Sequence, residues 1–169
     1  MREMLRVING MRDAGVITNY AIGGAMGAVY YLEAIFTMDV GIFIGFDDLM
    51  SSPLNPLGPI FDHLRPLGYG AAGEHIKIGG ELVQFLPAAD SLLKDALEKA
   101  IAVSFHGVQT RVMTAEHLMA IALRLGRPKD LARIAQFVEL DEFDESKLKK
   151  VLAQHRLSGK WTDFKTQYP

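Results

Sequence analysis

The sequence IGGAMGAVYYLEAIFTMDVGIFI, residues 22–44, decides the fold that we expect for this chain. Residues 17–24 predict a short strand that ends at a Gly-Gly turn, and residues 25–34 predict a helix. Residues 37–45 predict a second strand, rich in β-branched side chains and bounded by glycine. Asp39 lies inside that apolar run. Because burying an unpaired carboxylate is costly, we expect it to be protonated, paired or bound to a metal.

Two hypotheses explain the Gly-Gly turn and the aspartate. Glycines at the start of a helix let a phosphate approach free backbone N–H groups, and an aspartate on the neighbouring strand can hold Mg²⁺ against those phosphates. The other hypothesis is a tight strand-to-helix turn beside one hydrogen-bonded carboxylate. Gly-Gly alone favours this structural hypothesis, because so short a motif recurs by chance.

The rest of the chain predicts one hairpin, another strand and several helices. Helical spacing of apolar residues or capping signals indicate helices at residues 2–14, 59–68, 90–100, 114–126, 128–140, 144–156 and 160–168. Two apolar runs around Gly-Gly predict a hairpin at residues 74–87, and residues 108–114 predict a strand. This order predicts an α+β fold with a mixed sheet. We expect a head of residues 1–113 and a helical C-terminal part, residues 114–169, packed on it as one compact domain.

Composition excludes several classes of protein. The chain has 169 residues, about half of them hydrophobic, and a formal net charge of −2 at pH 7. A single filled core is therefore expected, and strong binding of nucleic acid is not. Cysteine is absent and the five histidines include no pair four residues apart, so neither disulfides nor a zinc site is expected. The charged N-terminal segment and the lack of a long apolar run predict a soluble, cytoplasmic protein without a membrane partner.

The order and spacing of three motifs carry a resemblance to a known family. They are Gly23–Met26 after the first strand, Thr37–Asp39 on the second, and Lys129-Asp130 within RPKDLARIAQF. Over residues 20–137 the chain resembles the DNA polymerase β-like nucleotidyltransferase superfamily. Within it, the chain looks most like small bacterial proteins related to abortive-infection and toxin–antitoxin nucleotidyltransferases. The resemblance implies a nucleotidyltransferase-type mixed β-sheet flanked by helices, with a helical C-terminal part.

The resemblance also implies a binding site for a nucleoside triphosphate. Asp39 is the implied catalytic residue and metal ligand, with a weakly held Mg²⁺ as cofactor. The implied nucleotide-binding residues are Gly23, Gly24, Thr37, Lys129 and Asp130. For Lys129 and Asp130 the alternative is a charged first turn of a helix, in which the aspartate suits the helix dipole.

Three departures from the family pattern weaken the implied metal site. The family has a second carboxylate two residues after the first, on the same face of the strand, and here that position is Gly41. A third carboxylate corresponds to Gln84, and the last residue of the family's Lys-Asp-x-x-Asp corresponds to Arg133. Two metals about 3.5–4 Å apart need bridging carboxylates. One aspartate and one amide therefore predict little or no nucleotidyl transfer.

Three functions follow as hypotheses. The leading one is a nucleotidyltransferase-like, toxin–antitoxin-related protein with a degenerate metal site that still binds a nucleotide. The alternative is an active nucleotidyltransferase that transfers NMP from an NTP to a protein, an RNA or a small molecule, with Asp47, Asp48, Glu74 or Glu81 among the missing ligands. The third is a structural or regulatory protein that binds a protein partner and no ligand.

Overall fold

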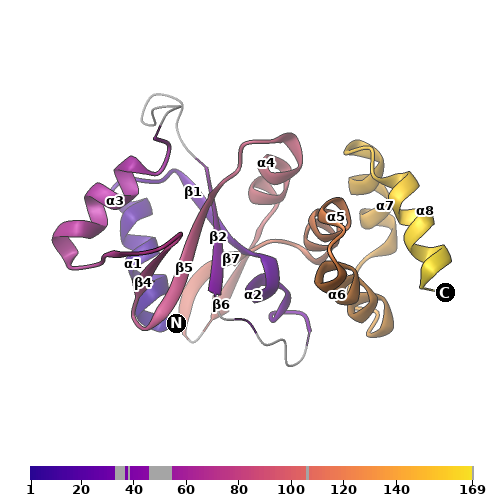
Figure 1. Ribbon diagram of the computed structural model, residues 1–169, viewed down its shortest axis with the longest axis horizontal. Coiled ribbons are helices and arrows are strands. Elements are labelled where there is room, and N and C mark those ends of the chain that lie inside the picture. Colours follow the sequence, from indigo (N-terminus) through magenta and orange to yellow (C-terminus); the bar gives the residue numbers. More distant parts are fainter. Residues whose placement is uncertain (33–36, 38, 46–54, 106, 169) are drawn as a thin grey trace.

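The computed structural model describes residues 1–32, 37, 39–45, 55–105 and 107–168, and Figure 1 shows a sheet with helices on both faces. The strands are β1 Asn19–Gly23, β2 Asp39–Gly45, β3 Ala71–Ala72, β4 His75–Ile78, β5 Glu81–Pro87, β6 Ile101–Phe105 and β7 Val108–Val112. The helices are α1 Arg2–Asp13, α2 Gly24–Ala28, α3 Gly58–Leu64, the 3₁₀ turn η1 Arg65–Leu67, α4 Ser91–Glu98, α5 Ala115–Leu125, α6 Pro128–Glu139, α7 Glu145–Gln154 and α8 Ser158–Gln167. Of these helices, none has the length and apolar character needed to cross a membrane.

Within the described residues, the strands form one seven-stranded mixed sheet in the order β3-β4-β5-β2-β1-β7-β6. Strands β1 and β2 are antiparallel, whereas β2 is parallel to β5 and β1 is parallel to β7. Strand β1 ends at Gly23 and α2 begins at Gly24, so the glycine pair turns the chain from strand into helix. The expected α+β fold and the two adjacent strands around the Gly-Gly turn are confirmed.

Alternation along β2 divides its side chains between two apolar clusters. Val40, Ile42 and Ile44 are buried with residues of α1 and α3 on one face of the sheet. Phe43 belongs to the cluster on the other face, formed with α4 and the C-terminal helices. Because successive side chains of a strand point to opposite faces, Asp39 shares the second face with Phe43. The pleat of β2 therefore turns the Asp39 carboxylate toward the face of the sheet that α4 and the C-terminal helices cover.

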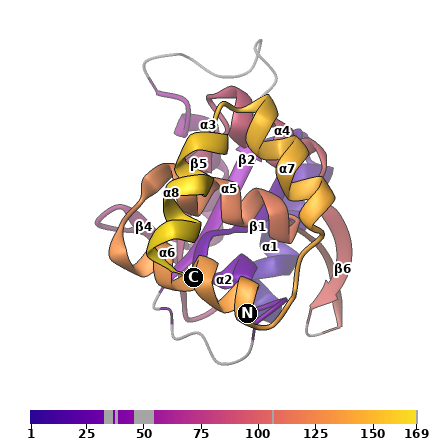
Figure 2. The same ribbon diagram turned by 90° about the vertical axis from the view of Figure 1, so that its right-hand side faces the viewer.

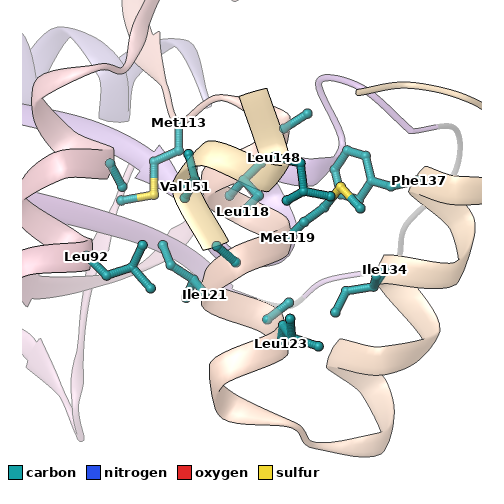
Figure 3. Packing of buried hydrophobic residues seen from close by; sticks show 14 of the residues in the cluster. Leu92, Met113, Leu118, Met119, Ile121, Leu123, Ile134, Phe137, Leu148 and Val151 are labelled. Carbon is teal, nitrogen blue, oxygen red and sulfur yellow. The ribbon is translucent and has the colours of Figure 1, made fainter. Parts of the chain in front are cut away.

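Helices α5 to α8 follow the last strand, and Figure 2 shows them in front of the sheet. Helix α5 is buried along nearly its whole length and contacts α2, α4, α6 and α7. Figure 3 shows Leu92 of α4 and Met113 beside Leu118 and Ile121 of α5, so one apolar cluster crosses the boundary at residue 113. The division of the chain into a head and a helical part stays a prediction.

The helix expected over residues 25–34 is shorter than the sequence suggests. Helix α2 ends at Ala28, residues 29–32 form turns, and residues 33–36 lie outside the described part of the chain. Valine and tyrosine side chains follow Ala28, and such side chains lose rotamer freedom in a helix. Tyr31 instead donates a hydrogen bond to the carbonyl oxygen of Met113 at 3.0 Å, a tertiary contact that the local sequence cannot reveal.

Two strands were not expected from the sequence. Strand β6 pairs with β7 in an antiparallel hairpin at the edge of the sheet. Most of its side chains are at least partly exposed, so the sequence lacks the alternation that marks a half-buried strand. Strand β3 has only two residues, too few to leave a pattern.

Candidate functional site

A cavity of about 980 Å³ lies between the sheet and the helices α5 and α6. Its sheet side is lined by Gly24, Thr37, Asp39, Gly41 and Gln84. Its helix side contains apolar side chains of α5 and the polar beginning of α6, including Lys129 and Asp130. The structure thus brings together the sequence-predicted residues of β2, β5 and α6, which are far apart in the chain.

Asp39 is the first residue of β2, and its side chain is 46% exposed. The hydroxyl of Thr37 donates to Asp39 Oδ1 at 3.3 Å and to the Asp39 carbonyl oxygen at 3.0 Å. The Nε2 atom of His75, on β4, lies 3.9 Å from Asp39 Oδ2. The apolar run around Asp39 therefore does not bury it, because its side chain lines the cavity and is nearly half exposed.

Gly41 and Gln84 lie beside Asp39 as neutral neighbours. They are register partners in the parallel strands β2 and β5, and both line the cavity. A methyl group built on Gly41 would approach its nearest neighbours only to 3.8 Å, which is ordinary van der Waals contact. Packing therefore leaves room for a Cβ atom at this position.

This set of donors does not fit a two-metal centre. In the described part of the chain, no group of three His, Asp or Glu side chains is arranged to hold a metal ion. Among the described residues on the sheet side of the cavity, Asp39 offers the one carboxylate and Gln84 offers a neutral amide oxygen. Divalent magnesium prefers several hard, charged oxygen ligands, and two metals need carboxylates that bridge them.

The glutamates that the structure describes outside the cavity do not replace the missing metal ligands. Glu81 Oε1 accepts a hydrogen bond from the amino group of Met1 at 2.6 Å. Glu74 is exposed, and neither glutamate lines the cavity. Asp47 and Asp48 lie outside the described residues.

Both glycines of the Gly-Gly turn have structural reasons for being glycine. A methyl group on Gly23 would lie 2.5 Å from Cε2 of Phe43 and 3.0 Å from Sδ of Met113. Gly24 has a φ of 60°, in the left-handed region that residues other than glycine rarely adopt. Gly24 lines the cavity, whereas Gly23 is not part of its lining.

Asp130 lines the cavity but is almost wholly covered, with 1% of its side chain exposed. It accepts hydrogen bonds from Arg127 Nε, from Arg127 Nη2 at 3.2 Å and from Arg133 Nη1 at 3.5 Å. Burial lowers the pKa of Arg133 and Asp130 opposes that effect, while the hydrogen bond to Asp130 raises the pKa of Arg127. Lys129 is exposed, and no described residue pairs with it. The structure therefore gives Asp130 the role of holding two guanidinium groups.

The spacing of the histidines does not mark a cluster of charged side chains around Asp95. Asp95 Oδ2, on α4, lies 3.1 Å from His117 Nε2 of α5 and 3.1 Å from His155 Nε2 beyond α7. Lys99 lies 3.0 Å from the other carboxylate oxygen. Burial raises the pKa of Asp95, but the hydrogen bonds from His155, Lys99 and His117 outweigh it and hold that pKa well below its usual range. The partners are 22 and 60 residues from Asp95, so no local spacing marks them.

Comparison with known proteins supports the fold. No protein-family model and no curated protein matches the sequence. Among solved structures, an antigenic nucleotidyltransferase-like protein from Paracoccidioides brasiliensis is similar, with a TM-score of 0.59 and 15% identity over 96% of this chain and 89% of that protein's. The solution structure of the antibiotic-resistance factor ANT(2'')-Ia is similar with a TM-score of 0.54 and 15% identity, over 99% of this chain and 98% of its own. The chain therefore has a nucleotidyltransferase-like α+β fold.

Proposed function

We propose that this chain binds a nucleoside triphosphate in the cavity between its sheet and α6, and that its metal site is degenerate. One observation carries the proposal: Gly24, Asp39, Gly41 and Gln84 line the same cavity as Lys129. These residues come from two strands, a turn and a distant helix, and the fold is nucleotidyltransferase-like. The nucleotide is the ligand class that the resemblance implies for such a site.

The cavity has the size and lining of a small-molecule site. Its volume of about 980 Å³ lies in the range of roughly 300–1,000 Å³ typical of ligand pockets. Leu86, Leu118 and Ile121 supply an apolar surface for a base, and polar groups lie at the ends of β2 and α6. An open cavity of this kind favours ligand binding over the hypothesis of a purely structural protein.

The same lining argues against efficient transfer of a nucleotidyl group. That reaction requires dications that neutralise the phosphates and activate the attacking group. Of the described residues on the sheet side, only Asp39 offers them a carboxylate, since Gly41 and Gln84 are uncharged. We therefore assign nucleotide binding with negligible turnover to the described site.

The cellular role rests on the motif resemblance alone. The order of the motifs around Gly23–Met26, Thr37–Asp39 and Lys129 supports a toxin–antitoxin-related bacterial protein that acts in the cytoplasm and binds a protein partner. The competing function is an active nucleotidyltransferase with a protein, RNA or small-molecule acceptor. The fold and Asp39 support that function as well, so activity has to be measured directly.

Two measurements on the full chain test the proposal. Calorimetric titration with ATP, GTP, CTP and UTP should detect binding of at least one nucleotide. Incubation with each labelled nucleotide and Mg²⁺ or Mn²⁺, with and without cell extract as acceptor, should yield no labelled product. Product that disappears in Asp39→Ala would establish an active enzyme, and the lack of binding by all four nucleotides would overturn the proposal.

A further inference from the structure

The cavity carries positive charge on a chain that is negative overall. The formal net charge of the chain is −2. Among the described residues that line the cavity, however, four side chains are basic and two are carboxylates. Arg124 is one of the four, and its Nη1 atom pairs with Asp90 Oδ1 at 2.9 Å. The remaining three are Arg127, Lys129 and Arg133, which we call the cationic wall.

Two arginines of the cationic wall share one carboxylate, that of Asp130. Asp130 accepts hydrogen bonds from both Arg127 and Arg133, so this group of three keeps a net positive charge. A guanidinium has five N–H donors in a planar fork, and no described side chain other than Asp130 accepts from either arginine. The contact with Asp130 fixes both guanidinium groups at the cavity, which reduces the entropy that they would lose on binding an anion.

The charges on the two sides of the cavity are therefore the reverse of those that a metal-dependent site requires. In the part of the chain that the structure describes, the sheet side has one carboxylate, Asp39, where dications need several. The helix side has a surplus of cations, which interact directly with phosphate oxygens through short, charge-assisted hydrogen bonds. Arg133 has only 15% of its side chain exposed, so water screens its charge less than that of a fully exposed residue.

We infer that the cationic wall holds the phosphates of the bound nucleotide directly, and that this binding needs no divalent metal. The inference rests on the proposed function, because it concerns the same cavity, and it names which side of the cavity holds the phosphates. Mg²⁺ bound to a triphosphate neutralises part of its negative charge, so added Mg²⁺ should weaken binding to the wall or leave it unchanged.

The test is calorimetric titration of ATP and of inorganic tripolyphosphate into the full chain, in EDTA and in excess Mg²⁺. Lys129→Gln is the main variant, because Lys129 is exposed and its replacement should leave the fold intact. Arg133→Gln is the second variant. Lys150→Gln is the matched control, since it removes the same charge from an exposed position on α7 outside the cavity.

Both ligands should bind in EDTA at least as tightly as in Mg²⁺. Lys129→Gln and Arg133→Gln should each weaken binding about ten-fold or more, the loss typical of one charge-assisted hydrogen bond, and Lys150→Gln should not. Binding of ATP only with Mg²⁺, or binding that both wall variants leave unchanged, would overturn the inference and leave the proposed function standing. Failure of ATP to bind under either condition would overturn the proposed function itself.

Discussion

Gly41 on β2 and Gln84 on β5 are register partners across two parallel strands, and both face the cavity beside Asp39. Positions 39 and 41 share one face of β2, as strand geometry requires. The structure therefore places two uncharged residues beside Asp39 on the sheet side of the cavity. Because a methyl group built at position 41 meets nothing closer than 3.8 Å, a carboxylate can be introduced there to test the proposed metal site.

Gly41→Asp should raise the affinity for Mn²⁺. The new carboxylate would lie on the same face as Asp39 and give a dication two charged ligands. We expect at least a roughly ten-fold gain, because even residues that only support a ligand change metal affinity by such a factor. Calorimetric or spin-resonance titration with Mn²⁺ measures it. Gly41→Asn is the control of similar size without the charge, and equal Mn²⁺ affinity of the two variants would contradict the prediction.

The central strands were predictable because their signals are local. The β-branched run of β2 and the glycine pair at the end of β1 fix the strand-turn-helix order, and the strand period places Asp39 and Gly41 on one face. The setting of Asp130 was not predictable, since its burial depends on how Arg127 and Arg133 fold over it. Position 84 was placed beside Gly41 only through the family resemblance, because register between distant strands leaves no sequence signal.

Gly23→Ala should destabilise the protein, although the residue is not part of the cavity lining. Its new methyl group would lie 2.5 Å from the ring of Phe43, so the ring or the strand has to move. Overpacking of this kind costs about 1–3 kcal/mol. Chemical denaturation followed by circular dichroism measures the free energy of unfolding.

The matched control for that variant is Gly10→Ala, on helix α1. A methyl group there meets nothing within 4 Å, and the residue lies in the helix interior. Alanine in place of glycine stabilises such a position by about 0.5–1 kcal/mol. The two substitutions should therefore shift stability in opposite directions, and a shift of the same sign would refute the packing argument for Gly23.

Stability should fall as the pH drops below about 6.5, the usual pKa of an unfolded histidine. Burial lowers the pKa of His117 in the folded chain, and the hydrogen bond to Asp95 only partly opposes it. Below pH 6.5 the unfolded chain therefore takes up a proton that the folded chain does not, which favours unfolding. His155, with 5% of its side chain exposed, and Lys99, with 52% of its side chain exposed, also contact Asp95.

The measurement is the melting temperature between pH 7.5 and 5.5 for the wild type and for His117→Gln. Glutamine keeps an N–H donor for Asp95 but does not titrate, so the variant should show a smaller fall in melting temperature over this range. Identical slopes for the two proteins would show that the buried imidazole is not the source of the pH dependence.

Asp130→Asn should destabilise the protein far more than the same substitution in an exposed ion pair. Asp130 is 1% exposed and accepts from Arg127 and Arg133, so asparagine would replace one accepting oxygen with a donor that faces guanidinium N–H groups. Leaving such buried groups unsatisfied costs about 1–3 kcal/mol. Asp62→Asn is the control, because Asp62 is 75% exposed and lies 3.8 Å from Arg65, and exposed pairs contribute little. Equal losses in denaturant titrations would mean that Asp130 does not hold Arg127 and Arg133 in place.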